Sequence, residues 1–353
     1  MYSDSVVTDV MTEGDCSRMN GSRSTTRRIA VAHRDLPGRS IDILSELFDV
    51  TVWHESRSPL ADEVAEFAAD ADALMCMGNV AIDAALFDRC PNLHLVALVS
   101  AGYDRVDVDA CRVRNVMVTN TPGVLHRSTA DLTFALMLGA RRLLTPAIDL
   151  LRAGEWQPLG LHEMLGLDVH GSVLGIIGFG EIGREVARRA RGFDMAVVHH
   201  NRTMRPSPDS QWVPFDDLLA TADIVSVHVP LSDNTRHLLG RREFALMKST
   251  ATLINTSRGA VVDTDALVDA LASCSIHSAG LDVFDVEPFR ELGHPLFALP
   301  NAFLLPHVGS ATEAARTAMV DKAAHNVTAV LHGSPAPNPL PGLRDLDRIV
   351  SST

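Results

Sequence analysis

The sequence predicts an α/β protein made of two doubly wound parallel-sheet units with a cleft between them. Short β-branched apolar runs alternate with helix-like segments, and the runs are apolar throughout rather than at every second residue. Such strands are typical of a parallel sheet covered by helices on both faces. The runs fall into two sets separated by one long helical stretch, and a length of 353 residues fits two domains better than one.

The elements of the first unit follow from these runs. Five strands are expected at residues 28–33, 50–54, 71–77, 93–100 and 116–120. Stretches between them, such as 40–48 and 62–69, carry apolar residues at helical spacing. The sequence therefore predicts alternating strands and helices over this part of the chain.

The second set of runs predicts six strands. These are expected at residues 172–178, 195–200, 224–230, 251–256, 278–284 and 302–306. A single long amphipathic helix is expected over residues 129–153 between the two sets, and a final helix over residues 311–331. The Pro-rich residues 333–341 are expected to be extended.

Composition excludes several classes of function. Lys and Arg number 31 and Asp and Glu number 44, so the formal net charge is −13 and no basic face for nucleic acid is expected. No apolar run approaches the length of about 20 residues that spans a bilayer, so no membrane partner is expected. The five cysteines are scattered without a CxxC pair, which argues against a disulfide framework and for a reducing, cytoplasmic setting. The 15 histidines form no HExxH motif, and no metal site is predicted.

Residues 1–27 are rich in Ser, Thr, Asp and Arg and lack an apolar segment. This composition is not that of a secretory signal, and the acidic residues argue against a transit peptide. The segment is expected to be a disordered N-terminal tail.

The strongest chemical motif opens the second set of strands. A G-x-G-x-x-G pattern directly follows an apolar strand and leads into a helix, as in a Rossmann dinucleotide site. The glycines would permit a tight turn, the approach of a pyrophosphate and close helix packing, with helix amides facing the phosphates. The alternative is a glycine-rich turn without a ligand. The motif residues are Gly178, Phe179, Gly180, Glu181, Ile182 and Gly183.

The loop after the next strand indicates which dinucleotide binds. A carboxylate directly after the strand would bind the ribose 2′-hydroxyl of NAD, but residues 201–205 contain none. Asn, Thr and Arg side chains can instead bind a 2′-phosphate, so NADP(H) is the preferred cofactor and NAD(H) the alternative. These side chains would otherwise form only an exposed basic loop. They are Asn201, Arg202, Thr203 and Arg205.

Three ionisable residues follow strands of the second set at the carboxyl edge, where ligands of open α/β sheets bind. Arg258 lies in Asn255-Thr-Ser-Arg-Gly259, Glu287 in Gly280-Leu-Asp-Val-Phe-Asp-Val-Glu-Pro288, and His307 in Leu305-Pro-His-Val-Gly-Ser310. An arginine, an acid and a histidine at one edge suit the reduction of a 2-keto acid, although each alone is more often structural.

With these segments in place, the sequence resembles the D-isomer-specific 2-hydroxyacid dehydrogenase family, and within it the glyoxylate/hydroxypyruvate reductase branch. The resemblance extends from about residue 28 to residue 341, and its seven segments occur in the order of the family pattern. The segments are Leu98-Val-Ser-Ala-Gly-Tyr-Asp104, Asn120-Thr-Pro-Gly-Val124, Thr129-Ala-Asp-Leu132 and residues 174–183, 255–259, 280–288 and 305–312.

The resemblance implies roles for the three ionisable residues. Arg258 would bind the substrate carboxylate and keto oxygen through its planar fork. His307 would donate a proton to the keto oxygen while nicotinamide supplies hydride. Glu287 would bind the other ring nitrogen of His307 and favour its protonated form. The expected reaction is NAD(P)H-dependent reduction of a small 2-keto acid to the D-2-hydroxy acid.

The resemblance also implies further contacts. The substrate would meet Gly78, Asn79, Ala101 and Gly102, together with Arg258 and His307. The cofactor would meet Thr129, Val229, Pro230, Thr235, Thr256, Ser257, Asp282 and Gly309. Asp282 could instead simply cap the loop after its strand. Two features depart from the family pattern, because Gly78-Asn79 lacks the serine of some hydroxypyruvate reductases and His126-Arg127-Ser128 is unusually basic.

The resemblance further implies the domain organisation and the assembly. Residues 28–125 would form a flavodoxin-like substrate-binding domain, residues 126–309 the Rossmann domain, and residues 310–353 would return to the first domain and end in a tail. A homodimer joined through the dinucleotide-binding domain is expected. Two alternatives share the fold: a dinucleotide-sensing, corepressor-like interaction protein, and a phosphoglycerate-type dehydrogenase.

Overall fold

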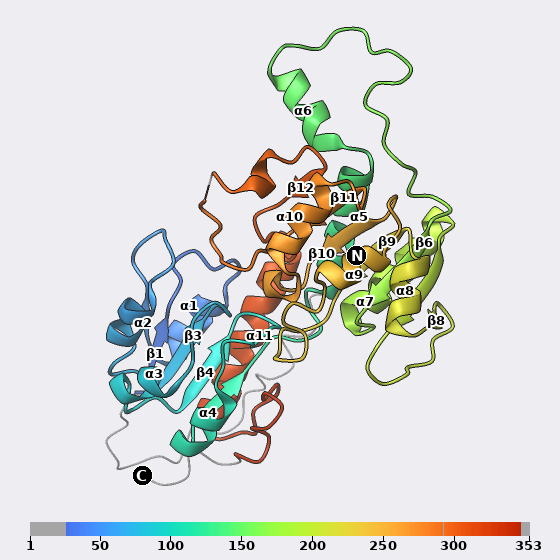
Figure 1. The fold of residues 1–353 in the computed structure, drawn as a ribbon. Helices are drawn as coiled ribbons and strands as arrows, with labels where there is room; N and C mark the ends of the chain where they lie inside the picture. The colour runs from blue at the N-terminus through green and yellow to red at the C-terminus, as the bar shows by residue number, and fades with distance from the viewer. Residues whose placement is uncertain (1–25, 292, 347–353) are drawn as a thin grey trace, which may run out of the picture.

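Two separate parallel β-sheets organise the chain in the computed structural model, which describes residues 26–291 and 293–346 (Figure 1). One sheet has five strands and the other has seven, and every strand pairing is parallel. The two doubly wound units expected from the sequence are therefore confirmed. The predicted N-terminal tail lies outside the described residues, apart from residues 26 and 27.

The first sheet has the strand order β2-β1-β3-β4-β5. Its central strands are buried along their whole length, as the unbroken apolar runs predicted. The strands are β1 (Arg28–Val31), β2 (Asp49–Val52), β3 (Ala73–Cys76), β4 (Leu95–Leu98) and β5 (Met117–Thr119). The helices that alternate with them are α1 (Ser40–Leu47), α2 (Ala61–Phe67), α3 (Ala84–Arg89) and α4 (Val108–Arg114).

The C-terminal helix α11 (Glu313–Leu331) packs on this first sheet, close to its predicted range. Met319, Val320 and Ala323 of the helix share one buried core with the strands. The segment after α11 then lies along the free edge of β5, where the Leu340 amide donates to the Val118 carbonyl at 3.0 Å. The expected extended conformation of this segment is thus confirmed next to β5.

The second sheet has the strand order β12-β11-β10-β9-β6-β7-β8. Six strands match the predicted set, whereas the two-residue β8 was not predicted because it has no apolar run. The strands are β6 (Val173–Ile177), β7 (Ala196–His200), β8 (Gln211–Trp212), β9 (Ile224–Val227), β10 (Thr252–Asn255), β11 (Ser278–Leu281) and β12 (Ala302–Leu304). The helices are α7 (Glu181–Ala190), α8 (Phe215–Thr221), α9 (Arg241–Leu246) and α10 (Thr264–Ala272), with short 3₁₀ turns η2 (Arg191–Phe193), η3 (Gly259–Val261) and η4 (Pro295–Ala298).

The single helix predicted over residues 129–153 is wrong. Two helices occupy the region, α5 (His126–Arg141) and α6 (Leu144–Arg152), and Leu143 between them has a left-handed φ of 50°. Pro146 explains the break, because it has no N–H to continue a helix but fits the first turn of a new one. The Arg141 carbonyl accepts instead from the Leu167 amide at 2.8 Å.

Helix α6 and the segment after it project away from the second sheet, at the top of Figure 1. Within the described ranges, none of the helices combines the length and apolar character needed to cross a membrane. The division of the chain near residues 125 and 310 remains our proposal. Its basis is that the first sheet draws its strands from before, and its helix α11 from after, the part that forms the second sheet.

Candidate active site

The glycine turn between β6 and α7 has two glycines that the protein itself requires. Gly178 has a left-handed φ of +95°, and a side chain there would lie 2.7 Å from the His228 backbone. A side chain on Gly183 would collide with the Gly178 carbonyl. At Gly180, by contrast, an added Cβ meets no atom within 4 Å. Glycine at residue 180 is instead explained by a pyrophosphate that must come close to the backbone there. The turn therefore fits a dinucleotide.

Asn201 connects this turn to the end of β7. Its Oδ1 accepts from the Phe179 amide at 2.7 Å, and its Nδ2 is buried without a hydrogen-bond partner. Arg202, Thr203 and Arg205 follow it on the exposed side of the same loop. The structure therefore leaves one buried donor and two exposed guanidinium groups beside the glycine turn.

His199 of β7 holds the same loop at Arg205. Its buried ring stacks on Phe179 with centroids 4.1 Å apart, and its Nε2 lies 2.9 Å from the Arg205 carbonyl. Because a carbonyl only accepts, Nε2 carries the proton and Nδ1 accepts from the Ser210 hydroxyl at 2.9 Å. Burial lowers the pKa of His199, which keeps the ring neutral.

His307 and Glu287 form the central pair of the site. The Nδ1 of His307 lies 2.6 Å from Glu287 Oε2, while the other carboxylate oxygen accepts from the Phe284 amide at 2.9 Å. The hydrogen bond to Glu287 raises the pKa of His307 against its partial burial. Burial acts to raise the pKa of Glu287, but hydrogen bonds from His307 and Phe284 outweigh it, so that pKa is lowered. The His307 side chain remains 46% exposed, so a substrate can reach it.

Arg258 completes the predicted trio and joins the two units. Its Nε donates to Asp104 Oδ1 at 2.7 Å and its Nη1 donates to the Ser257 carbonyl at 2.8 Å. Asp104 belongs to the loop after β4 of the other sheet. The positive charge of Arg258 acts to lower the pKa of both His307 and Glu287.

Asp104 is a site residue that the sequence reasoning missed. It lies in one of the matching segments, but its partner is 154 positions away. Its carboxylate is 17% exposed and fixes the orientation of the guanidinium from the other unit. Only the relative placement of the two units reveals this contact.

Asp282 supports the loop that carries His307. Its two carboxylate oxygens accept from the Val308 and Gly309 amides, each at 2.8 Å. Burial raises the pKa of this carboxyl. The loop-capping alternative for Asp282 therefore describes its observed contacts, and each oxygen retains a further lone pair.

The remaining predicted cofactor residues lie on loops that follow strands of the second sheet, except for Thr129 on α5. Thr129, at the start of α5, donates to the Gly309 carbonyl at 3.3 Å. Thr256 lies 3.3 Å from His228, and the Ser257 amide donates to Asn255. Val229 and Pro230 directly follow β9, and the Thr235 hydroxyl donates to the Pro230 carbonyl at 2.7 Å.

The predicted substrate loops meet beside Arg258. A side chain on Gly78 would collide with Ser100, and one on Gly102 would collide with the Arg258 guanidinium. Asn79, next to Gly78, is exposed. The loops after β3 and β4 therefore pack against each other, with the arginine directly over Gly102.

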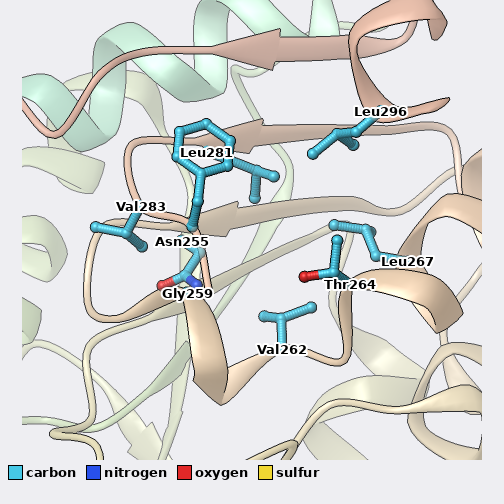
Figure 2. A pocket seen from close by; sticks show the side chains of 9 residues that line it. Asn255, Gly259, Val262, Thr264, Leu267, Leu281, Val283 and Leu296 are labelled. Atoms are coloured by element: carbon cyan, nitrogen blue, oxygen red, sulfur yellow. The ribbon is translucent and has the colours of Figure 1, made fainter. Parts of the chain in front are cut away.

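The core beneath these loops is closely packed. A void of about 10 Å³ remains between β10, β11 and η4, which is about the space of one water-sized sphere (Figure 2). A side chain on Gly259 would collide with the backbone of Phe284 and Asp285. The loops that carry Arg258 and Glu287 are thus held in direct contact. The residues around the void include Asn255, Val262, Leu267, Leu281, Val283 and Leu296.

Comparisons with known proteins agree with this geometry. Residues 134–309 match the family model described as D-isomer specific 2-hydroxyacid dehydrogenase, NAD binding domain. A glyoxylate reductase of Thermococcus gammatolerans is 44% identical over 312 residues, which cover 86% of this chain and 93% of the relative.

Two solved structures are similar over most of the chain. A glyoxylate reductase from Paecilomyes thermophila has a TM-score of 0.81 at 33% identity, covering 90% of this chain and 99% of its own. An NADPH-dependent glyoxylate/hydroxypyruvate reductase from Sinorhizobium meliloti, in complex with NADP and malonate, has a TM-score of 0.79 at 31% identity, covering 93% and 100%. Together with the fold and the trio of Arg258, Glu287 and His307, these findings show that the chain is an enzyme of the D-isomer-specific 2-hydroxyacid dehydrogenase family.

Proposed function

We propose that the protein reduces a small 2-keto acid, such as glyoxylate or hydroxypyruvate, to the D-2-hydroxy acid with NADPH. The observation that carries this proposal is the His307–Glu287 pair at 2.6 Å, whose Glu287 lies on a loop that packs against Gly259, the neighbour of Arg258. The names of the similar reductases support the same substrate class.

The proposed roles follow from the free donors of each side chain. Since Nδ1 of His307 is held by Glu287, its Nε2–H is the proton available for the keto oxygen. Arg258 uses Nε on Asp104 and one Nη1–H on Ser257, so the Nη2 side remains for the substrate carboxylate. A bound nicotinamide supplies the hydride. The neutral His307 that results keeps its Nδ1–H bond to Glu287.

The proposed preference for NADPH rests on the loop after β7. The buried Nδ2 of Asn201 and the exposed Arg202 and Arg205 offer donors for a 2′-phosphate, and this loop has no acid at the ribose position. Thr203, exposed in the same loop, offers a further hydroxyl. The NADP-bound relative from S. meliloti supports this choice.

The test is the initial rate of NADPH and, separately, NADH oxidation with glyoxylate and with hydroxypyruvate. We expect turnover that favours NADPH and is lost in His307→Ala. Faster turnover with NADH would overturn the cofactor preference alone. If neither cofactor supported turnover with these or with bulkier 2-keto acids, the proposed reaction would be wrong.

We also propose a cytoplasmic homodimer joined through α6 and the segment that follows it, which we call the α6 region. Large apolar side chains are exposed there, including Trp156 at 64% and Leu161 at 93%. An exposed apolar surface of this kind marks an interaction site. The described cysteines Cys76, Cys90, Cys111 and Cys274 are free, which supports a reducing compartment.

A further inference from the structure

Three asparagines from distant parts of the chain form a series of hydrogen bonds that we name the asparagine chain. Asn338 Nδ2 donates to Asn326 Oδ1 at 2.9 Å, and Asn326 Nδ2 donates to the Asn120 carbonyl at 3.1 Å. Asn120 Nδ2 then donates to the Ala101 carbonyl at 2.7 Å. The asparagine chain thus leads from the C-terminal segment through α11 and the end of β5 to the predicted substrate loop.

Burial shows that these amides are placed for their hydrogen bonds. Asn326 is fully buried on α11 and Asn120 is 9% exposed. A buried amide is unfavourable unless its polar groups are bonded, so an apolar residue would serve better if only packing mattered. The backbone N–H of Asn120 also donates to the Asn338 carbonyl at 3.2 Å. Both the N–H and the C=O of Asn120 are therefore hydrogen-bonded.

The last bond of the asparagine chain sets the direction of a backbone amide. The peptide between Ala101 and Gly102 is trans, so its C=O and N–H point in opposite directions. Since Asn120 holds the Ala101 carbonyl, the Gly102 N–H must point away from Asn120. The Ser100 hydroxyl donates to the Gly102 carbonyl at 2.8 Å and fixes the next peptide as well.

The surroundings of Gly102 suit an anionic ligand. The Arg258 guanidinium occupies the place of a Gly102 side chain, so the amide and the cation lie next to each other. An oriented N–H beside a guanidinium is a strong site for a carboxylate. A rotation of this peptide would remove the amide from the site while leaving the cation in place.

We propose that Asn120 is a positioning residue that aims the Gly102 amide at the substrate carboxylate, and that Asn326 and Asn338 hold Asn120 in place. The inference rests on the proposed function, in which this loop binds the carboxylate of a 2-keto acid. It adds Asn120, which directly follows β5, Asn326 of α11 and Asn338 of the C-terminal segment to the determinants of substrate affinity.

The test compares Asn120→Asp and Asn338→Asp with the control Asn92→Asp, an exposed asparagine of the same unit. Asn120→Asp keeps the side-chain shape but replaces the donor to Ala101 with an acceptor. The KM for glyoxylate should rise about tenfold, equivalent to about 1.4 kcal/mol, with kcat and the Kd of NADPH unchanged. That split is expected when an interaction binds the ground state and the transition state equally. Asn338→Asp should produce a smaller rise in the same KM, and the control none.

A second measurement is independent of turnover. Hydrogen–deuterium exchange of the peptide covering residues 100–104 should accelerate in Asn120→Asp and not in Asn92→Asp, because the loop loses its anchor. An unchanged KM for glyoxylate in folded Asn120→Asp would overturn the inference. If the glyoxylate KM and the NADPH Kd both rose by a similar factor while the melting temperature fell, Asn120 would have a purely structural role instead.

The two proposals fail in different ways. If the wild-type enzyme reduces no 2-keto acid, the proposed function fails, and unchanged exchange of residues 100–104 in Asn120→Asp then overturns the positioning role by itself. If Asn120→Asp does not fold, the half-exposed Asn338→Asp decides by the same KM and exchange measurements.

Discussion

At the scale of single residues, the proposed reaction depends on an imidazole whose two nitrogens have different tasks. Glu287 binds Nδ1 of His307 at 2.6 Å and raises the pKa of the ring, which leaves Nε2 as the donor that we propose for the substrate. The protonated ring is the form that can act as an acid, so the reaction in the direction of reduction should slow as pH rises through this pKa.

Glu287→Gln should therefore shift the pH profile. Removal of the carboxylate lowers the pKa of His307 toward or below its ordinary value, so the loss of activity on the alkaline side begins at a lower pH. The measurement is kcat/KM for glyoxylate against pH, with the exposed Glu291→Gln from the same loop as control. Coincident profiles for Glu287→Gln and wild type would contradict this role.

Asp104→Asn tests the contact that joins Arg258 to the other unit. The variant retains an oxygen near Arg258 Nε but loses the charge, and a hydrogen bond between charged groups contributes about 1.5–3 kcal/mol. Because the guanidinium is 29% exposed, we expect the lower end, a fall of about tenfold in kcat/KM for glyoxylate. Asp109→Asn, exposed on α4, is the control, and equal kinetics of both variants would refute the assignment.

The common location of the proposed trio could be predicted from the sequence because Arg258, Glu287 and His307 all follow strands of one sheet, and parallel strands end at a common edge. Asp104 and the asparagine chain could not. Each depends on contacts between segments more than one hundred positions apart, and no local pattern carries that information.

At the scale of elements, the glycines of the turn between β6 and α7 are needed for different reasons. Gly183 is required by packing within the protein, whereas Gly180 is not. Gly180→Ala meets no protein atom within 4 Å, so the melting temperature should not change while the KM for NADPH rises. Gly183→Ala collides with the Gly178 carbonyl and should lower the melting temperature. Thermal unfolding and cofactor kinetics of the two variants check this, and an unstable Gly180→Ala with normal KM would reverse the interpretation.

Arg141 links the end of α5 to the amino edge of the second sheet, the edge opposite to the candidate active site. Its buried guanidinium donates to the Asp168 carbonyl at 2.9 Å and to the Asp223 carbonyl at 2.8 Å. Arg141→Met leaves these carbonyls without their donor and should lower the free energy of unfolding by about 2–3 kcal/mol. Urea unfolding checks this against the exposed neighbour Arg142→Met, and equal stability of the two variants would exclude the role.

Helices and strands could be predicted where burial requires a recognisable apolar pattern in the sequence. Strands such as β3, β4 and β10 are buried at every residue, and their apolar runs are correspondingly unbroken. Strand β8 has one exposed and one half-buried residue and therefore no such mark. The break between α5 and α6 had a local signal in Pro146, but the apolar spacing on both sides concealed it.

At the scale of the whole molecule, the projecting α6 region makes the proposed dimer testable. Leu151 and Leu161 are 63% and 93% exposed in that region. The wild-type enzyme should have the mass of a dimer of 38.1 kDa chains by light scattering, and Leu151→Asp with Leu161→Asp should shift it toward the monomer. Val113→Asp, 82% exposed on α4, is the control. A monomeric wild type would contradict the dimer.

The return of α11 and residues 338–340 to the first sheet has a consequence for biosynthesis. All strands of the second sheet lie between β5 and α11, so the ribosome produces that unit whole while the first sheet still lacks a helix of its core and the cover of its β5 edge. An uncovered apolar face and an open strand edge attract other nascent chains. The first sheet is thus completed only after the second, although its strands are synthesised before it.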